Sequence, residues 1–320
     1  MVRKDLVVVA NDFLQGIWVE KYRPKTINEM VLSNANKVFL EQIKKKGETP
    51  NLMLAGAPGT GKTSMAKVIV NDILDCQYLY INASEENGIN DIRSKVMSFA
   101  QTRSIDSKIK VIILDECDFL SINAMAALRN IMEEYQGTTR FVLTCNYPFK
   151  VIPAIHSRCQ ELDVTPPLNG VLTKCVNILK AENVTVPGDV KEKLVSLIKT
   201  TFPDIRKCIN RIQKNTIDGV LVIENIDNIG GLSTEIWDMV LNKKDITKIR
   251  EYIISKETDF NNDYHALLKQ LFEAIYDSSL SVDKKRLALL TVSEAMYRHV
   301  SVLDTEINVF SCIVQLGDII

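Results

Sequence analysis

The segment that most constrains the fold lies directly after a short apolar run at residues 52–55. It reads GAPGTGKT and satisfies the pattern G-x-x-x-x-G-K-[ST] in full. Glycines here let backbone N–H groups wrap around phosphate oxygens, and the helix that follows adds its positive N-terminal end. We expect Lys62 to reach the β- and γ-phosphates and the Thr63 hydroxyl to ligate Mg²⁺. The predicted phosphate-binding residues are Gly56, Pro58, Gly59, Thr60, Gly61, Lys62, Thr63 and Ser64.

Apolar runs of strand length alternate with stretches of helical period through the first half of the chain. The predicted strands are 52–55, 78–81, 111–114, 141–144 and 159–164. The predicted helices between them are 62–74, 89–101 and 122–135. Apolar strands joined by helices pair in parallel, because the helices then cover both faces of the sheet. We therefore predict an α/β nucleotide-binding domain with a parallel five-stranded sheet at residues 1–165.

The second half of the chain has a different pattern. Pro166-Pro167 ends the alternation, and the sequence then predicts helices at 168–183, 188–201 and 203–217. This stretch is too short for a second large domain and fits a small helical lid at residues 166–230. Beyond Ser233 the helical period resumes without a strand signal, which predicts an all-α domain at residues 231–320.

Polar residues follow two of the predicted strands. Parallel strands end at the ligand-binding edge of a sheet, so Asp115 and Glu116 are expected to face the phosphates. Asp115 suits a contact with Mg²⁺, and Glu116 suits a general base that polarises the attacking water. The alternative is that both acids favour the N-terminus of the next helix. Asn146 could orient the same water, although an asparagine after a strand is often a turn residue.

Composition excludes several classes of protein. The 39 basic and 40 acidic residues leave a net charge of −1, so any contact with DNA must come from a local patch. Seven cysteines without a C-x-x-C pair argue against a zinc ribbon and favour free thiols in a reducing compartment. The apolar run near the N-terminus is too short for a secretion signal, and no run is long enough for a membrane span. We expect an intracellular protein without membrane association.

Several separate segments together resemble the ATPase subunits of sliding-clamp loaders, which belong to the AAA+ class. They are EKYRP (20–24), the phosphate-binding loop, LDE (114–116), NAMAALRNIMEEYQGTT (123–139), RFVLTCN (140–146), SRC (157–159) and FPDIRK (202–207). The resemblance is to replication factor C small subunits and, in length and in the segment 202–207, to the large subunit of T4-type bacteriophage loaders. It covers about residues 20–217, whereas 231–320 match only in length and helical character.

The resemblance implies roles for residues around the nucleotide. Tyr22, Arg23 and Pro24 are expected to border the adenine and the triphosphate, with Val31 on the adenine side. Arg206 is implied as the second sensor, which reaches from the lid to the γ-phosphate of its own subunit. Asn146 is implied as the first sensor.

Two further arginines are implied to act between subunits. Arg158 resembles an arginine finger that enters the site of the neighbouring subunit, and Arg129 resembles an inter-subunit coupling residue. The alternative for each arginine is a solvated or salt-bridged surface position, and the motif setting favours the functional interpretation more for Arg158 than for Arg129.

Residues 88–110 carry five basic residues against two acids and are the local basic patch of the chain. In the resembling family, helices after the second and third strands line a chamber that follows the DNA duplex. Arg93 is therefore the best candidate for a phosphate contact, with Lys95 beside it, and contacts to phosphate do not read sequence. The alternative is a solvated helix face.

The resemblance implies an ATP- and Mg²⁺-dependent motor subunit that loads a sliding clamp at primer–template DNA, with hydrolysis stimulated by both. It also implies a helical collar at 231–320, a homo-oligomer with a distinct companion subunit, and clamp docking by the apolar face of helix 122–135. The location is cytoplasmic, or nuclear for a eukaryotic protein. The alternatives are another AAA+ ring ATPase, of the branch-migration or helicase-loader type, and a non-hydrolysing scaffold, against which Glu116 and Arg158 argue.

Overall fold

A computed structural model describes residues 16–85, 89–102, 109–223, 229–257, 260, 262–299 and 301–320. The chain divides into two compact units, Met1–Val222 and Ile223–Ile320. In the part of the chain that the structure describes, no helix is long and apolar enough to cross a membrane.

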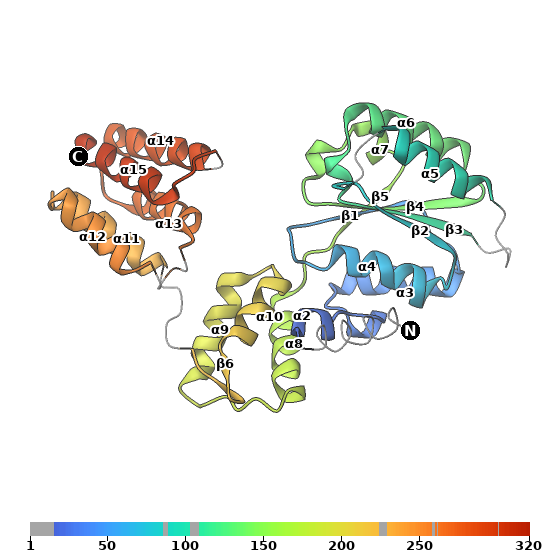
Figure 1. Ribbon diagram of the computed structural model, residues 1–320, viewed down its shortest axis with the longest axis horizontal. Coiled ribbons are helices and arrows are strands. Elements are labelled where there is room, and N and C mark those ends of the chain that lie inside the picture. The colour runs from blue at the N-terminus through green and yellow to red at the C-terminus, as the bar shows by residue number, and fades with distance from the viewer. Residues whose placement is uncertain are drawn as a thin grey trace, which may run out of the picture. The chain divides into compact units, whose positions relative to one another are not determined.

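A parallel five-stranded sheet lies at the centre of the first unit (Figure 1). Its strands are β1 (Leu52–Ala55), β2 (Tyr78–Asn82), β3 (Lys110–Asp115), β4 (Thr139–Cys145) and β5 (Gln160–Asp163). They pair in the order β2-β3-β4-β1-β5, so β2 is an edge strand and β4 lies between β3 and β1. The predicted parallel sheet of the α/β domain is confirmed, and each predicted strand agrees with an observed one to within two residues at either end.

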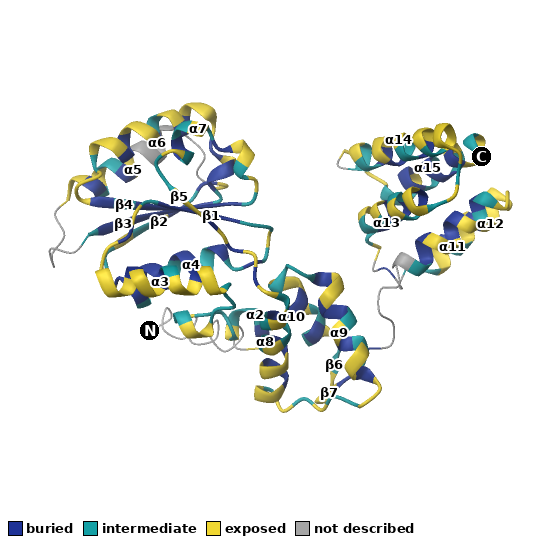
Figure 2. Ribbon diagram, turned by 180° about the vertical axis from the view of Figure 1, so that it is seen from behind, coloured by how far each residue is buried: buried dark blue, intermediate teal, exposed yellow. Residues whose placement is uncertain are grey.

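Helices cover both faces of this sheet (Figures 1 and 2). They are α3 (Asn34–Lys46), α4 (Lys62–Val68), α5 (Ile89–Gln101), α6 (Ile122–Glu134) and α7 (Pro153–His156). Side chains alternate along each strand, so Leu52 and Leu54 pack against α3 and α4 on one face. Met53 and Ala55 pack against α5, α6 and α7 on the other face. The run of buried residues in β1 follows from this double cover.

The rest of the first unit is helical with one small hairpin. Its elements are α2 (Trp18–Lys21), η1 (Ile27–Glu29), η2 (Ile69–Ile73), η3 (Cys117–Phe119), η4 (Pro148–Lys150), α8 (Leu168–Ala181), α9 (Val190–Thr201), α10 (Ile205–Lys214), β6 (Thr216–Ile217) and β7 (Val220–Leu221). The structure places α8, α9 and α10 where the sequence predicts lid helices, and the lid boundaries remain a prediction.

Two predicted helices are shorter than expected. The helix predicted at 62–74 is α-helical only to Val68, and the π-helical turn η2 follows it. The helix predicted at 203–217 ends at Lys214, because β6 and β7 then form an antiparallel hairpin. Asp218 and Gly219, with φ of 48° and 76°, form its two-residue turn. An Asp-Gly pair is a strong hairpin signal, so the sequence held the information.

The second unit is helical throughout its described residues. Its helices are α11 (Ile229–Leu241), α12 (Ile246–Ser255), α13 (Tyr264–Asp277), α14 (Val282–His299) and α15 (Thr305–Ile319). They share one apolar core, in which Trp237, Phe260, Leu268, Val292 and Leu316 are at most 3% exposed. The helical character predicted for the C-terminal region is confirmed, and the predicted domain boundary at 231 remains a prediction.

Candidate active site

The phosphate-binding loop connects β1 to α4. Gly59 and Gly61 have φ of 76° and 99°, a left-handed conformation that glycine adopts without strain. Lys62, at the first position of α4, is only 7% exposed, and its ammonium donates to the carbonyl oxygens of Gly56 and Ala57 at 2.8 Å. Burial lowers the pKa of Lys62, and the nearby acids partly oppose this effect. A cation held in this loop can bind an anionic ligand.

Asp115 is the best-anchored acid of the site. Its carboxylate is nearly buried and accepts three hydroxyl hydrogen bonds. Thr63 donates from α4 at 2.9 and 3.0 Å, Thr144 from β4 at 2.6 Å, and Tyr80 from β2 at 2.7 Å. The sequence predicted Thr63 and Asp115 but gave no sign of Tyr80 or Thr144. Their hydrogen bonds depend on which strands become neighbours in the sheet.

Thr63 and Asp115 have the donor set for Mg²⁺. A hydroxyl and a carboxylate are hard oxygen ligands of the type that Mg²⁺ prefers. Ligands on adjacent corners of an octahedron with Mg–O distances of 2.0–2.1 Å lie about 3 Å apart. The oxygen atoms of these two side chains are separated by 2.9–3.0 Å, so the pair fits this ion.

Glu116 occupies a special position at the end of β3. Its backbone is left-handed, with φ 56° and ψ 44°, which is unusual for a residue with a side chain. Its N–H donates to the Thr144 hydroxyl at 2.9 Å, and its side chain does not cap the following turn. Thr144 therefore contacts both acids, because the same hydroxyl donates to Asp115. Strained backbone of this kind is typical of functional sites.

Asn146 follows β4, the strand between β3 and β1. A second acid of the loop after β3 holds this turn: Asp118 is 7% exposed and accepts the N–H groups of Asn146 and Tyr147 at 3.3 and 3.2 Å. Asp118 is thus a further residue of the site that sequence reasoning missed. Asn146 thus lies at the end of the strand between β3 and β1, and its role remains a prediction.

The lid contacts the phosphate-binding loop directly. The N–H of Ile205, the first residue of α10, donates to the Gly59 carbonyl at 3.1 Å. Asp204 caps α10 by accepting the N–H of Lys207 at 2.8 Å and packs on Gly59. A Cβ atom at position 59 would lie 1.8 Å from the Asp204 carboxylate, so only glycine fits there. This contact brings the start of α10, and with it Arg206, beside the loop.

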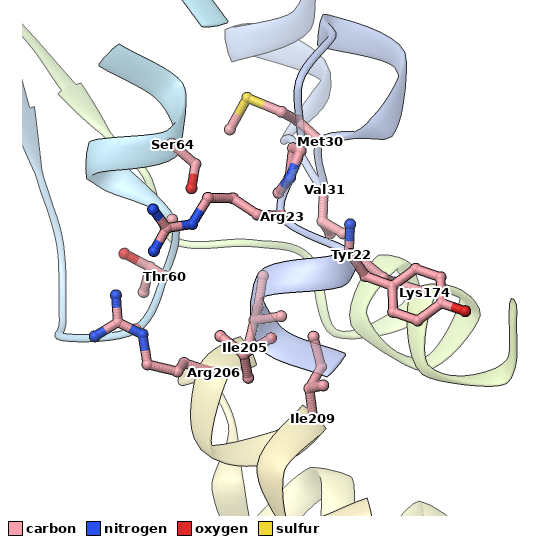
Figure 3. A pocket seen from close by; sticks show the side chains of 14 residues that line it. Tyr22, Arg23, Met30, Val31, Thr60, Ser64, Lys174, Ile205, Arg206 and Ile209 are labelled. Carbon is pink, nitrogen blue, oxygen red and sulfur yellow. The ribbon is translucent and has the colours of Figure 1, made fainter. Parts of the chain in front are cut away.

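A pocket lies between this loop, the lid and the segment after α2 (Figure 3). Its lining includes nine of the predicted nucleotide-binding residues, namely Tyr22, Arg23, Pro24, Val31, Gly59, Thr60, Gly61, Ser64 and Arg206. The guanidinium groups of Arg23 and Arg206 both point toward Thr60 of the loop, and Ser64, in the first turn of α4, lies beside that of Arg23 (Figure 3). Two cations and an anion-binding loop therefore converge on one space.

Sequence reasoning missed five residues of this pocket: Val19, Met30, Lys174, Ile205 and Ile209. Four are apolar and suit the faces of a planar base. The fifth, Lys174, donates to the Glu29 carbonyl at 3.1 Å, and burial lowers its pKa. They come from α2, the segment before Val31, and two lid helices, so only the fold brings them together.

Four of the predicted phosphate ligands lie outside this pocket. Gly56, Pro58, Lys62 and Thr63 belong to the loop but do not line this pocket. The Tyr22 hydroxyl donates to Glu182 at the end of α8 at 2.6 Å, so its polar end serves the junction with the lid.

Arg158 lies at the opposite end of the sheet from the phosphate-binding loop. It precedes β5, in which Gln160 pairs with Leu52 at the start of β1, whereas the loop follows the end of β1. Its guanidinium forms an ion pair with Glu133 of α6 and donates to the Ala154 carbonyl at 2.7 Å. Among the described residues its Nε atom has no hydrogen-bond partner and is buried.

The other predicted basic residues have different positions. Arg129 is exposed on α6 and donates to its neighbour Asn130 at 3.0 Å. Lys95 is exposed on α5, and the side chain of Arg93 lies outside the described residues. Counting Lys110 in the basic patch was wrong. Lys110 is 1% exposed and donates to Phe99, Ala100 and Thr102 carbonyls at the end of α5, where a cation complements the helix dipole.

Comparison with known proteins identifies the family of the chain. Residues 52–166 match the family described as ATPase family associated with various cellular activities (AAA). The chain is 33% identical over 317 residues to the replication factor C small subunit of Staphylothermus marinus, covering 94% of each protein. The chain belongs to the replication factor C small-subunit family. It is 32% identical over 320 residues to the small subunit of Methanococcus maripaludis, covering 95% of this chain and 99% of that protein.

The family membership confirms the clamp-loader ATPase predicted from sequence motifs. This replication factor C-like chain is an AAA+ ATPase subunit of a clamp loader. A solved structure of the Thermotoga maritima RuvB Holliday junction branch migration motor is also similar, with a TM-score of 0.52. It covers 84% of this chain and 85% of RuvB, and the two sequences are 17% identical. That likeness is one of fold alone.

Proposed function

We propose that this subunit binds ATP with Mg²⁺ and uses its hydrolysis to open a sliding clamp and load it at primer–template junctions. The observation that supports the proposal best is the contact between the Thr63 hydroxyl and the Asp115 carboxylate at 2.9 Å. The two residue types that P-loop ATPases use for the metal lie together, and the buried ammonium of Lys62 begins the same helix.

The triphosphate lies along the loop in this proposal. Lys62 donates to the β- and γ-phosphate oxygens in place of the two carbonyl oxygens that it now contacts. Thr63 and Asp115 would hold Mg²⁺, which when bound neutralises charge on the phosphates. Arg23 and Arg206 direct their guanidinium groups toward the same space, which fits contacts with the outer phosphates (Figure 3). The apolar residues of the pocket lie around the base.

Hydrolysis needs a positioned water and a base. The water oxygen attacks the γ-phosphorus, Glu116 accepts the proton of that water, and ADP leaves with the electrons of the broken P–O bond. Asn146 orients the water from the turn after β4. Thr144 positions both acids, since its hydroxyl contacts the Asp115 carboxylate and the Glu116 N–H.

Arg158 acts on a neighbouring subunit in this proposal. It lies near the start of β1, whereas its own phosphate-binding loop lies beyond the end of that strand. Its partner Glu133 is exposed, so the ion pair can open when a neighbour's γ-phosphate approaches. Arg129, four residues before Glu133 on α6, is well placed to couple the same interface.

The apolar face of α6, to which the resemblance assigned clamp docking, is buried in the core of the first unit, so that expectation was wrong. We infer instead that the clamp docks on an apolar patch formed by η3, the start of α6 and the turn after β4. Phe119, Ile122, Tyr147 and Phe149 are 52%, 73%, 44% and 81% exposed. The Asp118 carboxylate ties the two segments together by accepting the N–H of Tyr147. Large exposed apolar groups gathered in this way are typical of protein interaction sites.

Further partners follow from the same proposal. Lys95 and Arg93 of α5 contact the phosphates of primer–template DNA. Exposed apolar residues of the second unit, which include Leu287, Leu290 and Tyr297 on α14, contact other subunits of a collar. The FPDIRK segment and the chain length resemble those of T4-type bacteriophage loaders, which favours a homo-oligomer with a distinct companion. A subunit of this phage type would act in the cytoplasm of the host cell.

The rate of ATP hydrolysis tests the proposal. The purified complex should hydrolyse ATP slowly alone and faster when primed DNA and its clamp are both present. Lys62→Ala in the same complex serves as the control and should abolish both rates. If neither DNA nor clamp stimulates hydrolysis, the proposed clamp-loading function is wrong, although the ATPase activity stands.

A further inference from the structure

Tyr80 is a residue of the acid cluster that no motif predicts. It lies in the edge strand β2, and the register pairs Tyr80 with Ile113 and Asn82 with Asp115. Side chains two residues apart on a strand share a face, so Tyr80 is a diagonal neighbour of Asp115. The tyrosine is long enough to span that diagonal, and its hydroxyl donates to Asp115 Oδ2 at 2.7 Å.

The three hydroxyl donors of Asp115 differ in what else they must do. Thr63 donates to both carboxylate oxygens, but the proposed function assigns its oxygen to Mg²⁺. Thr144 donates to Oδ1, and Tyr80 donates to Oδ2. When Thr63 turns to the metal, Thr144 and Tyr80 are the two donors that still fix the carboxylate, one on each oxygen.

The ring of Tyr80 is itself held in place. The ammonium of Lys67, on α4, lies 5.0 Å from the ring centroid, within the range of a cation–π contact. This contact helps to hold the ring from which the hydroxyl reaches Asp115.

We propose that Tyr80 is a positioning residue for the metal–nucleotide site, which holds the Asp115 carboxylate in the orientation that binds Mg²⁺. The inference rests on the proposed roles of Asp115 and Thr63. It gives the edge strand β2 a part in nucleotide binding, although β2 contributes no residue to the phosphate-binding loop. Partners that orient a metal ligand typically change metal affinity by about 10–100-fold when they are removed.

Tyr80→Phe in the full-length protein tests this role, because it removes only the hydroxyl and leaves the ring over which Lys67 lies. Tyr78→Phe is the matched control: it makes the same change on the same strand, and both tyrosines are 38% exposed. Mn²⁺, a paramagnetic substitute for Mg²⁺, is titrated against each protein with ADP, and free Mn²⁺ is measured by electron paramagnetic resonance. Thermal melting of each variant checks that the fold is intact.

Tyr80→Phe should weaken Mn²⁺ binding in the ADP complex about tenfold, with the metal-free affinity for ADP and the melting temperature unchanged. Tyr78→Phe should match the wild type. Equal Mn²⁺ affinity in all three proteins would overturn the role of Tyr80 and leave the proposed function intact. A wild type that binds no Mn²⁺ with ADP would overturn the metal site of the proposed function, and the inference with it.

Discussion

The two units of the chain bury different kinds of residue. Among the residues that the structure describes, ten of the twelve buried polar or charged ones lie in the first unit, including Lys62, Asp115 and Asp118. Among the described residues of the second unit, only Ser233 and Asn308 are buried and polar. A buried polar group costs free energy unless it is paired, and Lys62, Asp115 and Asp118 find their partners within the candidate site. The first unit carries the chemistry, and its motifs are readable for that reason.

The second unit is distinguished by exposed apolar residues rather than by buried polar ones. It has no motif, but Leu287, Leu290 and Tyr297 on α14 are 53%, 53% and 84% exposed. Many apolar residues can serve an assembly surface equally well, whereas a phosphate site accepts few residue types. The contrast separates hydrolysis from assembly, and substitutions in each unit should separate them in the same way.

The largest effect is expected from Glu116→Gln in the first unit. Loss of a general base should lower the steady-state rate of ATP hydrolysis by about 10²–10⁴-fold. ATP binding, measured by fluorescence of a labelled nucleotide, should remain near wild type, because the loop and Lys62 are intact. Near-normal turnover would remove Glu116 from the mechanism.

Arg158→Ala should have the next largest effect and should lower the rate of ATP hydrolysis by about 10²-fold. This is smaller than the 10³–10⁵-fold effect known for arginine fingers in GTPases. Since Arg158 is proposed to act on a neighbour, mixing this variant with Lys62→Ala should restore part of the activity. Some interfaces then pair an intact loop with an intact finger. ATPase is measured across mixing ratios after subunit exchange has been verified. Activity absent at every ratio would argue that Arg158 acts within its own subunit or that all sites must be intact.

Leu290→Ser tests the second unit. Loss of an apolar interface anchor should weaken assembly by roughly tenfold or more, as seen by light scattering over a dilution series. Nucleotide binding should not change, because the phosphate site lies in the other unit. Val38→Ser on α3 is the control, with the same 53% exposure in the first unit. If both variants assemble equally well, this face of α14 does not form the collar contact.

The smallest effect is expected for DNA. Replacing Arg93 and Lys95 together by alanine should lower the slope of log affinity against log salt by about two units, because each phosphate contact releases about one counterion. The affinity for primer–template duplexes should fall by the same factor whatever their sequence. Lys45→Ala is the control, since α3 covers the other face of the sheet. An unchanged slope would show that the two residues do not contact DNA phosphates and belong to a solvated helix face.

The sequence specified most of the fold because the features that decide it are local. The phosphate-binding loop, the apolar strands and the Asp-Gly turn of residues 218–219 can each be found within a few residues of sequence. The hydrogen bond from Tyr80 to Asp115 could not, since it depends on β2 pairing with β3 across 35 positions. The burial of Lys110 could not be predicted for the same reason. Its lysine side chain caps a helix only because the end of α5 packs beside β3.

The most direct measurement is the amount of clamp retained on primed circular DNA. The assembled complex, its clamp and the DNA are incubated with ATP, and clamp bound to DNA is separated from free clamp by gel filtration. Clamp should elute with the DNA only when ATP is present, and linearising the DNA should release it. With Lys62→Ala in the complex, clamp on DNA should fall to the level without ATP. Clamp that never exceeds this level with the wild-type complex would contradict the clamp-loading function.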